Sequence, residues 1–503
     1  MSGESMTLTA FVLNVFAVSV LAIFVLGGIT LAILYIIDVR QTRHAIRHNY
    51  PVIGRLRYWF EHLGAFFRQY FFSMDREEMP FNRAQRSWVY RAAKNLDSTQ
   101  PFGSTKRIDV PGTVLFVSTP FPTLSEDACE SEPVVIGPQC PHPFTAKSFF
   151  NISGMSFGAI SKPAVKALSR GAAEAGCWMN TGEGGLSQYH LEGGCDIVFQ
   201  IGTANYGVRD AAGNLSEEKL REVAAIEQVK MFELKISQGA KPGKGGILPG
   251  LKVTEEIAGI RGIPVGKDSI SPNRHKNVRT VSDLLDSLNR IREVTGKPVG
   301  FKMVMGGTSF FEDLFTAISE RGHEYAPDFI TLDSADGGTG AAPQSLMDHA
   351  GMPIRESLPQ VADLLEEFDL RGRIKLVASG KLINPGDVAW ALCAGADFVV
   401  AARGFMFALG CIQAMQCNKN TCPTGVTTHD PKLQAGLDPT DKAVRVANYA
   451  RNMVYEVGVI AHSCGVPEPR QLTRRHARIV VEPGRSVSLQ TLYDQRDQPI
   501  RIL

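Results

Sequence analysis

Short apolar segments alternate with helix-forming segments from residue 148 onward, and this alternation restricts the fold more than any other feature. Gly, Ser, Asp or Lys repeatedly follows the end of an apolar segment. Eight β segments separated by helix-capable spacers predict an α/β fold, a (β/α)8 TIM barrel whose chemistry lies on the loops after the strands. A doubly wound open sheet is the alternative, but the GxGxxG fingerprint after an early strand is missing. The predicted strands are Phe149–Ser153, Trp178–Thr181, Ile197–Ile201, Met231–Ile236, Val299–Val304, Phe329–Asp333, Ile374–Ala378 and Phe398–Ala402.

Glycine is in excess, at 48 of 503 residues, and it gathers after the predicted strand ends. Glycine there lets backbone N–H groups approach a planar or anionic ligand without a Cβ in the way. In phosphate-binding barrels the last two loops grip the phosphate, so we expect a phosphorylated cofactor. The glycine-rich loops are 154–158, 181–185, 238–246 and 333–341, and the two candidate phosphate loops are Ser379–Lys381 and Arg403–Gly404.

Three of the nine cysteines are clustered, and the other six are scattered as small buried residues would be. The odd count and a reducing cytoplasmic environment argue against a disulfide framework. Cys411, Cys417 and Cys422 lie within twelve residues, and Pro423 follows the last. Three thiolates closed by Cys-Pro are typical of iron–sulfur ligation. Structural zinc is the alternative, with His429 as the fourth ligand, and chance clustering is a third.

The N-terminal region carries an uncharged apolar run. No charged side chain occurs from Ser5 to Ile37, and residues 10–37 are almost continuously apolar. About 20 apolar residues span a bilayer, so one transmembrane helix is predicted. A cleaved signal peptide is the competing interpretation, but it needs a basic start and a run of only about 7–15 residues. Arginines follow the run, so the positive-inside rule places the rest of the chain in the cytoplasm, anchored by a single pass to the inner membrane.

Four regions follow from these patterns. Residues 1–50 form the transmembrane helix and a basic juxtamembrane segment, and residues 51–145 form a linker or interfacial region. The barrel with the cysteine segment covers residues 146–430, and a tail of residues 431–503 packs on it, with a closing strand near Ile479. Aromatic and basic side chains mix between Arg57 and Phe72, which suits either an interfacial helix or a helix packed on the barrel. The net charge of +2 gives no reason to expect nucleic acid as a partner.

Taken together, these motifs resemble those of a known protein family. The run from Asn151 to Pro431 resembles the FMN-binding synthase domain of glutamate synthase, in particular short bacterial FMN-binding glutamate-synthase-like proteins with an N-terminal membrane helix. The resemblance implies an FMN-dependent oxidoreductase acting on CH–NH2 donors, with a 3Fe-4S cluster bound by Cys411, Cys417 and Cys422. The matching motifs are the Met155-Ser156 loop, Thr181–Gly185, Lys235–Gly250, Ile270-Ser271-Pro272, Asp336–Ala341 and the three-cysteine segment.

The resemblance also implies roles for single residues. Lys241, Arg261 and Glu183 match positions that contact 2-oxoglutarate or iminoglutarate, and two cations can pair the two carboxylates of such a substrate. A cation such as Lys235 beside the flavin favours its anionic reduced form. The residues implied to hold FMN are Met155, Ser156, Thr181, Lys235, Lys302, Gly337, Gly338, Gly380 and Gly404.

Three departures from the family pattern bear on function. Ile247 stands where the family has a glutamine, which removes an expected polar substrate contact and puts the identity of the substrate in question. Ser2 follows Met1, so no N-terminal cysteine nucleophile is present, and we expect no glutaminase domain. The missing dinucleotide fingerprint predicts that electrons arrive from another protein through the cluster.

Three functions are therefore compared. The first is reductive amination of a 2-oxo acid, such as 2-oxoglutarate to glutamate, or the reverse oxidation of the amino acid. The second is an electron-transfer subunit that links a membrane partner to a soluble redox partner. The third keeps the barrel but acts on hydroxy acids or isoprenoid phosphates, as other FMN barrels do. Those barrels lack a cysteine segment of this kind.

Overall fold

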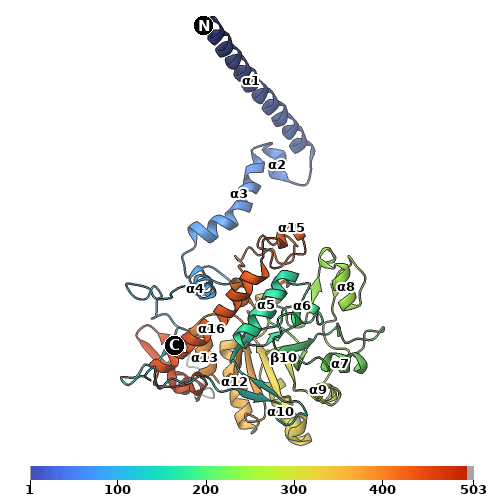
Figure 1. Ribbon diagram of the computed structural model, residues 1–503, viewed down its shortest axis with the longest axis vertical. Helices are drawn as coiled ribbons and strands as arrows, with labels where there is room; N and C mark the ends of the chain where they lie inside the picture. Colours follow the sequence, from blue (N-terminus) through green and yellow to red (C-terminus); the bar gives the residue numbers. More distant parts are fainter. Residues whose placement is uncertain (1, 495–503) are drawn as a thin grey trace. The chain divides into compact units, whose positions relative to one another are not determined.

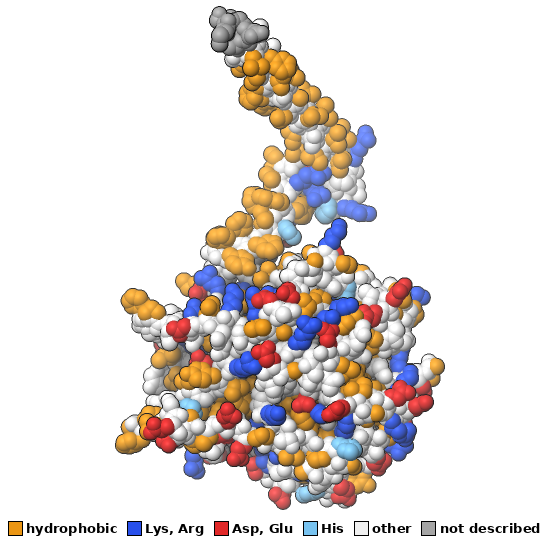
Figure 2. All heavy atoms as spheres, in the orientation of Figure 1, with side chains coloured by type: hydrophobic (Ala, Val, Ile, Leu, Met, Phe, Trp, Pro, Cys, Tyr) orange, Lys and Arg blue, Asp and Glu red, His pale blue; other side chains and the backbone are white. Residues whose placement is uncertain are grey.

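The computed structural model describes residues 2–494 and divides after Arg83 into two compact units. The first unit contains α1 (Ser2–Arg40), α2 (Ala45–Asn49), α3 (Gly54–Phe67) and a π-helical turn, η1 (Arg68–Phe72). The apolar side chains of α1 from Leu8 to Ile37 lie exposed (Figure 2). Residues 7–40 are long and apolar enough to cross a bilayer, and a signal sequence has the same properties. The predicted N-terminal apolar helix is confirmed.

One side chain ties the end of α1 to the start of α3. The carboxylate of Asp38 accepts hydrogen bonds from Arg55 Nε and Nη2, both at 2.8 Å, and from the backbone N–H of Val52 at 3.0 Å. Asp38 is fully buried by these contacts. A bidentate arginine pair has a defined geometry. The direction in which α3 leaves α1 is therefore set within this unit.

The second unit is built on a closed barrel of eight parallel strands in the order β4-β5-β6-β7-β10-β11-β12-β13. All eight predicted barrel strands are confirmed, three of them with the same ends and five with ends that differ by one or two residues, so the open-sheet alternative is wrong. The strands are β4 (Phe150–Ile152), β5 (Met179–Asn180), β6 (Ile197–Ile201), β7 (Val229–Lys235), β10 (Val299–Val304), β11 (Phe329–Asp333), β12 (Lys375–Ser379) and β13 (Phe398–Ala401).

Helices cover the outside of the barrel (Figure 1), and several of them begin at side-chain caps. Ser161 accepts from the N–H of Ala164 at the start of α5, and Thr280 and Asp283 form a capping box on α9. The long helix α16 packs along α5. The covering helices are α5 (Lys162–Ala175), α6 (Gln188–Leu191), α7 (Glu217–Ala224), α8 (Glu255–Arg261), α9 (Val281–Thr295), α10 (Ser309–Arg321), α11 (Gln344–Met347), α12 (Ile354–Glu367), α13 (Pro385–Cys393), α14 (Arg403–Ala408), α15 (Pro431–Gln434) and α16 (Pro439–Ser463).

The barrel interior is layered. Its lower end is apolar and is closed by the hairpin of β2 (Val134–Ile136) and β3 (Phe144–Ala146), whose side chains join Trp178 and Phe398 in one buried cluster. Above it lies a polar layer around the buried carboxylate of Glu233. This carboxylate accepts from Asn180 Nδ2 at 2.8 Å, Gln200 Nε2 at 2.6 Å and Thr331 Oγ1 at 2.6 Å. The upper end of the barrel is the open end.

The remaining elements flank the barrel. Helix α4 (Arg83–Ala93) is held on α16, where Asn452 donates to the carbonyl of Ala92 at 2.8 Å. The division after Arg83 therefore falls within the segment 51–145 that the sequence treats as one region. The predicted closing strand near Ile479 is confirmed as part of β14. The flanking strands and last helix are β1 (Val114–Phe116), β8 (Ile247–Leu248), β9 (Ser269–Ile270), β14 (Ala477–Glu482), β15 (Arg485–Ser488) and α17 (Leu489–Asp494).

Candidate active site

A cavity of about 1260 Å³, partly open to solvent, lies at the carboxyl ends of the barrel strands. Loops after most of the barrel strands contribute to its wall, which is where chemistry is placed in barrels of this type. Most of the residues predicted for cofactor and substrate meet here, together with one of the three clustered cysteines. The predicted residues that line the cavity are Met155, Ser156, Glu183, Lys235, Lys241, Arg261, Lys302, Gly338, Gly380 and Cys417.

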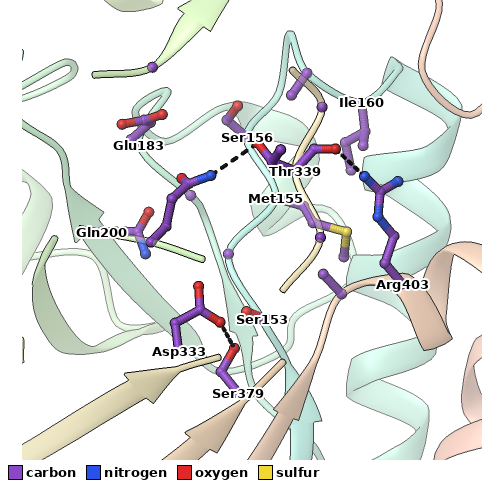
Figure 3. A pocket seen from close by; sticks show the side chains of 18 of the residues that line it. Ser153, Met155, Ser156, Ile160, Glu183, Gln200, Asp333, Thr339, Ser379 and Arg403 are labelled. Atoms are coloured by element: carbon purple, nitrogen blue, oxygen red, sulfur yellow. Dashed lines mark hydrogen bonds between the residues drawn. The ribbon is translucent and has the colours of Figure 1, made fainter. Parts of the chain in front are cut away.

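The floor of the cavity is organised by Asp333 at the end of β11. Its carboxylate lies 3.3 Å from Lys302 Nζ and accepts from Ser379 Oγ at 2.8 Å and from the N–H of Gly239 at 2.9 Å. Figure 3 shows Asp333 and Ser379 bonded to each other below the loops. Asp333 thus joins the ends of three strands and neutralises Lys302, which makes the floor rigid and close to neutral.

Glycine is required at the cavity wall where two loops touch. Gly182 has a φ of +64°, and a Cβ on it would lie 2.5 Å from the backbone nitrogen of Ser156. A Cβ on Gly338 would lie 2.6 Å from Nε of Arg403. Arg403 also donates to the carbonyl of Thr339 (Figure 3). Because these glycines have no side chain, the loops pack closely against each other and against Arg403, and the space of the cavity stays open for a ligand.

Glu183 is the acid of the cavity and stands among three cations. Its carboxylate lies 3.2 Å from Lys235 Nζ. Burial alone would raise the pKa of Glu183, but Lys235, Lys241 and Arg261 outweigh burial and hold the pKa below its ordinary value. A Cβ on Gly246 would lie 2.2 Å from the Glu183 carboxylate. The side chain is therefore ionised and clamped in place.

Lys241 and Arg261 are buried cations, with 6% and 5% of their surface exposed. Burial lowers the pKa of Lys241, while Glu183 opposes that shift. Arg261 donates to Ser269 Oγ at 3.1 Å and to the carbonyl of Phe157 at 3.3 Å, and its guanidinium lies over the ring of Tyr206. Its buried Nε has no hydrogen-bond partner among residues 2–494. No carboxylate forms an ion pair with either cation in that range.

Ile247 also lines the cavity, at its mouth. It pairs with Ile270 across the two-stranded β8–β9 ribbon. Their exposed fractions are 40% and 66%, so the rim of the cavity is apolar at this point. The amide that the family resemblance predicts at this position is thus replaced by an exposed branched alkyl group.

Three residues predicted to hold the cofactor lie behind the wall. Thr181 Oγ1 accepts from the N–H of Gln200 at 3.0 Å, and Gly337 lies under Gly239. Gly404 faces the other way: a Cβ there would lie 2.1 Å from the hydroxyl of Tyr449 on α16. The close packing of α14 against α16 is therefore sufficient reason for glycine at 404.

The three clustered cysteines share one loop, and each has its own surroundings. Cys417 Sγ lies 3.8 Å from Arg403, and Cys422 Sγ lies 3.5 Å from Thr424 Oγ1. Burial raises the pKa of Cys411 to about 11. No three Cys, His, Asp or Glu side chains between residues 2 and 494 converge on one point as ligands of a single metal ion would. His429 bonds instead to the carbonyl of Gly158 at 2.8 Å, which gives the zinc alternative no support.

Four residues in or behind the cavity wall are missing from the residues predicted for the site. Asp333, Gln238 and Gln200 line the cavity, and Lys252 lies behind it, bonded to the loops at Ala159 and Cys417. Asp333 ends a predicted strand and could have been included for that reason. Lys252 could not, because a lysine in a loop is usually solvated.

Comparison with known proteins agrees with this geometry. The family model described as the conserved region in glutamate synthase matches residues 122–467, more than half of the chain. The chain belongs to the glutamate synthase family. A glutamate synthase large subunit-like protein, YerD, of Bacillus subtilis is 38% identical over 97% of this chain and 98% of its own length. The archaeal glutamate synthase [NADPH] of Methanocaldococcus jannaschii is 35% identical over 65% of this chain and 61% of its own length.

Two solved structures align with most of this chain at low sequence identity. The flavin-binding domain of baker's yeast flavocytochrome b2 aligns with 14% identity and a TM-score of 0.45, covering 83% of this chain and 85% of that domain. A mandelate oxidase aligns with 15% identity and the same TM-score, covering 79% and 90%. Within the glutamate synthase family, this chain matches YerD along nearly its whole length and the archaeal protein along about two thirds of its length.

Proposed function

We propose that this member of the glutamate synthase family is a membrane-anchored FMN and 3Fe-4S oxidoreductase that reductively aminates a 2-oxo acid, or runs the reverse reaction. One observation carries the proposal: Lys241 and Arg261 are buried, positively charged and free of carboxylate pairing within residues 2–494, at the wall of a glycine-lined cavity. A wall of this kind suits an anionic substrate held beside a cofactor.

The chemistry of the cavity wall fits FMN. It opens at the carboxyl ends of the strands, and its glycine-rich loops bring backbone close to the empty space. Lys381 and Arg403 follow the last two barrel strands, where phosphate is held in such barrels. Lys235 and Lys302, paired with Glu183 and Asp333, place ammonium hydrogen-bond donors deeper in the cavity. Bound FMN supplies two-electron redox chemistry, while the chain supplies position and charge.

The chain's own residues would then handle the substrate. Lys235 pairs with Glu183, so the positive charge of Lys241 and Arg261 remains for the carboxylates of a 2-oxo acid. Glu183 stays ionised and so acts as an acceptor, able to orient an ammonium or imine N–H group. The apolar rim at Ile247 favours a substrate whose outer part needs no hydrogen bond there.

The cysteine segment fits a 3Fe-4S cluster better than a single ion. In such a cluster each cysteine binds a different iron, so three thiols need not converge on one point. The described cysteines form no disulfides, and Cys417 lies beside the cation of Arg403. An electron-donor protein supplies the reducing electrons in this proposal. Helix α1 anchors the protein in the inner membrane with the barrel in the cytoplasm, by the positive-inside rule.

An electron-transfer subunit is the second candidate. It is favoured by Ile247, because loss of a polar substrate contact is expected where the cavity no longer turns over a 2-oxo acid. In that case electrons pass between a membrane partner and a soluble partner, and the cavity holds only the cofactor.

Anaerobic titration of the purified, detergent-solubilised protein tests the proposal. We expect amino acids to bleach the flavin absorbance band, and 2-oxo acids plus ammonia to restore it. The Lys241→Met variant, with its flavin content intact, should respond at least tenfold more weakly. Flavin that exchanges electrons only with a partner protein would favour the second candidate, and protein without flavin and iron would refute both.

A further inference from the structure

Lys252 is a fully buried lysine outside the cavity. It ends the short 3-10 turn η2 (Gly250–Lys252) that follows β8, and 1% of its surface is exposed. Its ammonium donates to the carbonyl of Ala159 at 2.7 Å and to the carbonyl of Cys417 at 3.3 Å. Ala159 lines the cavity directly after the first glycine-rich loop, and Cys417 is one of the three clustered cysteines. The lysine therefore joins the cofactor cavity to the cysteine segment.

The charge of Lys252 has no carboxylate to balance it. Within residues 2–494 no Asp or Glu forms an ion pair with its ammonium. Burying a charge is expensive unless it is paired, and two neutral carbonyls compensate only in part. Burial lowers the pKa of Lys252 to about 8, and the thiols of Cys417 and Cys422 oppose that shift. The expected counter-charge is thus on sulfur.

Connecting the two loops does not by itself need a charge. His429, seven residues after Cys422, joins the same pair of segments through its ring and the carbonyl of Gly158 at 2.8 Å. Burial lowers the pKa of His429 to about 4, so this connection is neutral at physiological pH. The neutral ring of His429 already connects the two segments. The buried ammonium of Lys252, which connects them a second time, therefore requires an electrostatic reason.

We propose that Lys252 is the counter-charge of the cluster held by Cys411, Cys417 and Cys422, and that it raises the reduction potential of that cluster. This inference rests on the proposed function. One-electron reduction by dithionite adds one negative charge to the cluster, and no bond to the three thiolates forms or breaks. A fixed buried cation stabilises the more negative, reduced form, and net charge is one of the factors that set such potentials.

A redox titration of the full-length protein, followed by the EPR signal of the cluster, tests the inference. We expect Lys252→Met to lower the midpoint potential by at least 59 mV, which is tenfold in the one-electron equilibrium constant. Lys252→Arg, which keeps the charge, should stay closer to the wild-type value. The exposed Lys267, on the loop that follows α8, provides the control Lys267→Met, with no shift expected. An unchanged midpoint in a Lys252→Met protein with full iron content would overturn the inference.

Thermal unfolding with and without the cluster gives a second, independent readout. After removal of iron with a chelator, the charge is uncompensated, so Lys252→Met should unfold at the same temperature as the wild type or higher. With the cluster present, the wild type should be the more stable protein. A Lys252→Met protein that is less stable in both states, or that does not fold at all, would show a purely structural lysine and refute the inference. Wild-type protein without iron would instead refute the proposed function.

Discussion

At the scale of single residues, glycine has two different roles in this barrel: some glycines line the cavity, and Gly404 allows two helices to pack closely. At Gly182 and Gly338 a Cβ would meet the opposite wall of the cavity, whereas at Gly404 it would meet Tyr449 on an outer helix. All three glycines follow or border strand ends in the sequence, so the pattern predicts a cofactor role for each. The structure distinguishes Gly404, which packs against a helix, from Gly182 and Gly338, which line the cavity, because it shows what a Cβ at each position would touch.

We predict that Gly404→Ala destabilises the protein without removing its flavin. Overpacking of a buried contact costs about 1–3 kcal/mol, and here the Cβ would lie 2.1 Å from the Tyr449 hydroxyl. Urea unfolding of the solubilised protein measures the loss, and the ratio of flavin to folded protein should stay at the wild-type value. Tyr449→Phe in the same chain removes the nearest clashing atom and should recover part of the stability.

The matched control is Gly372→Ala, at an exposed loop glycine whose Cβ would have no neighbour within 4 Å. Its unfolding midpoint should equal that of the wild type. A Gly404→Ala protein of normal stability that has lost its flavin would instead assign Gly404 to the cofactor, as the family resemblance implies.

At the scale of elements, α3 and η1 carry an exposed aromatic surface. Trp59 is 54% exposed and lies edge-on to Phe60, and Phe67 lies against Phe71 of η1. Arg57 and Arg68 occur on the same segment. This helix carries exposed aromatic and basic side chains and leaves the end of the apolar helix α1 at a direction set by Asp38 and Arg55. Such a helix suits a headgroup layer.

We predict that Trp59 lies in the membrane interface. In the full-length protein reconstituted into vesicles, lipids brominated near the headgroup should quench part of the tryptophan fluorescence, because Trp59 is the most exposed of the four tryptophans. Trp59→Phe should remove that quenching. Trp88→Phe, in a helix packed on α16, is the control and should leave it in place. Quenching that persists without Trp59 would argue for a helix that lies away from the lipid.

For the whole molecule, the distribution of arginine predicts orientation. Arg40, Arg43 and Arg47 follow the apolar run of residues 10–37, and a single acid, Glu4, precedes it. Protease added to inside-out membrane vesicles should therefore release the barrel, while right-side-out vesicles should protect it. Sequencing the N-terminus of the mature protein distinguishes the signal-peptide alternative, in which α1 would be absent. Digestion in right-side-out vesicles alone would reverse the predicted orientation.

The sequence predicts the barrel and its open end because both depend on local patterns. Apolar strands of a few residues, such as Ile197–Ile201 and Phe329–Asp333, are separated by helix-forming spacers, and glycine marks the loops after them. For five of the eight strands the observed ends differ from the predicted ends by one or two residues. The reason is that local sequence does not specify where the last hydrogen bond between two strands forms. The candidate residues of the cavity were found in the same way, by their place after a strand.

Contacts between distant segments could be seen only in the tertiary structure. Three contacts of this kind join residues far apart in the chain. Glu233 accepts three hydrogen bonds from other barrel strands. Glu183 pairs with Lys235, and Lys252 is buried between Ala159 and Cys417. By itself, the sequence determined the barrel, the apolar helix and the residue types at the open end, because periodicity and glycine act locally. Only the folded chain decided which charges are paired, because burial and distance are properties of the packed molecule.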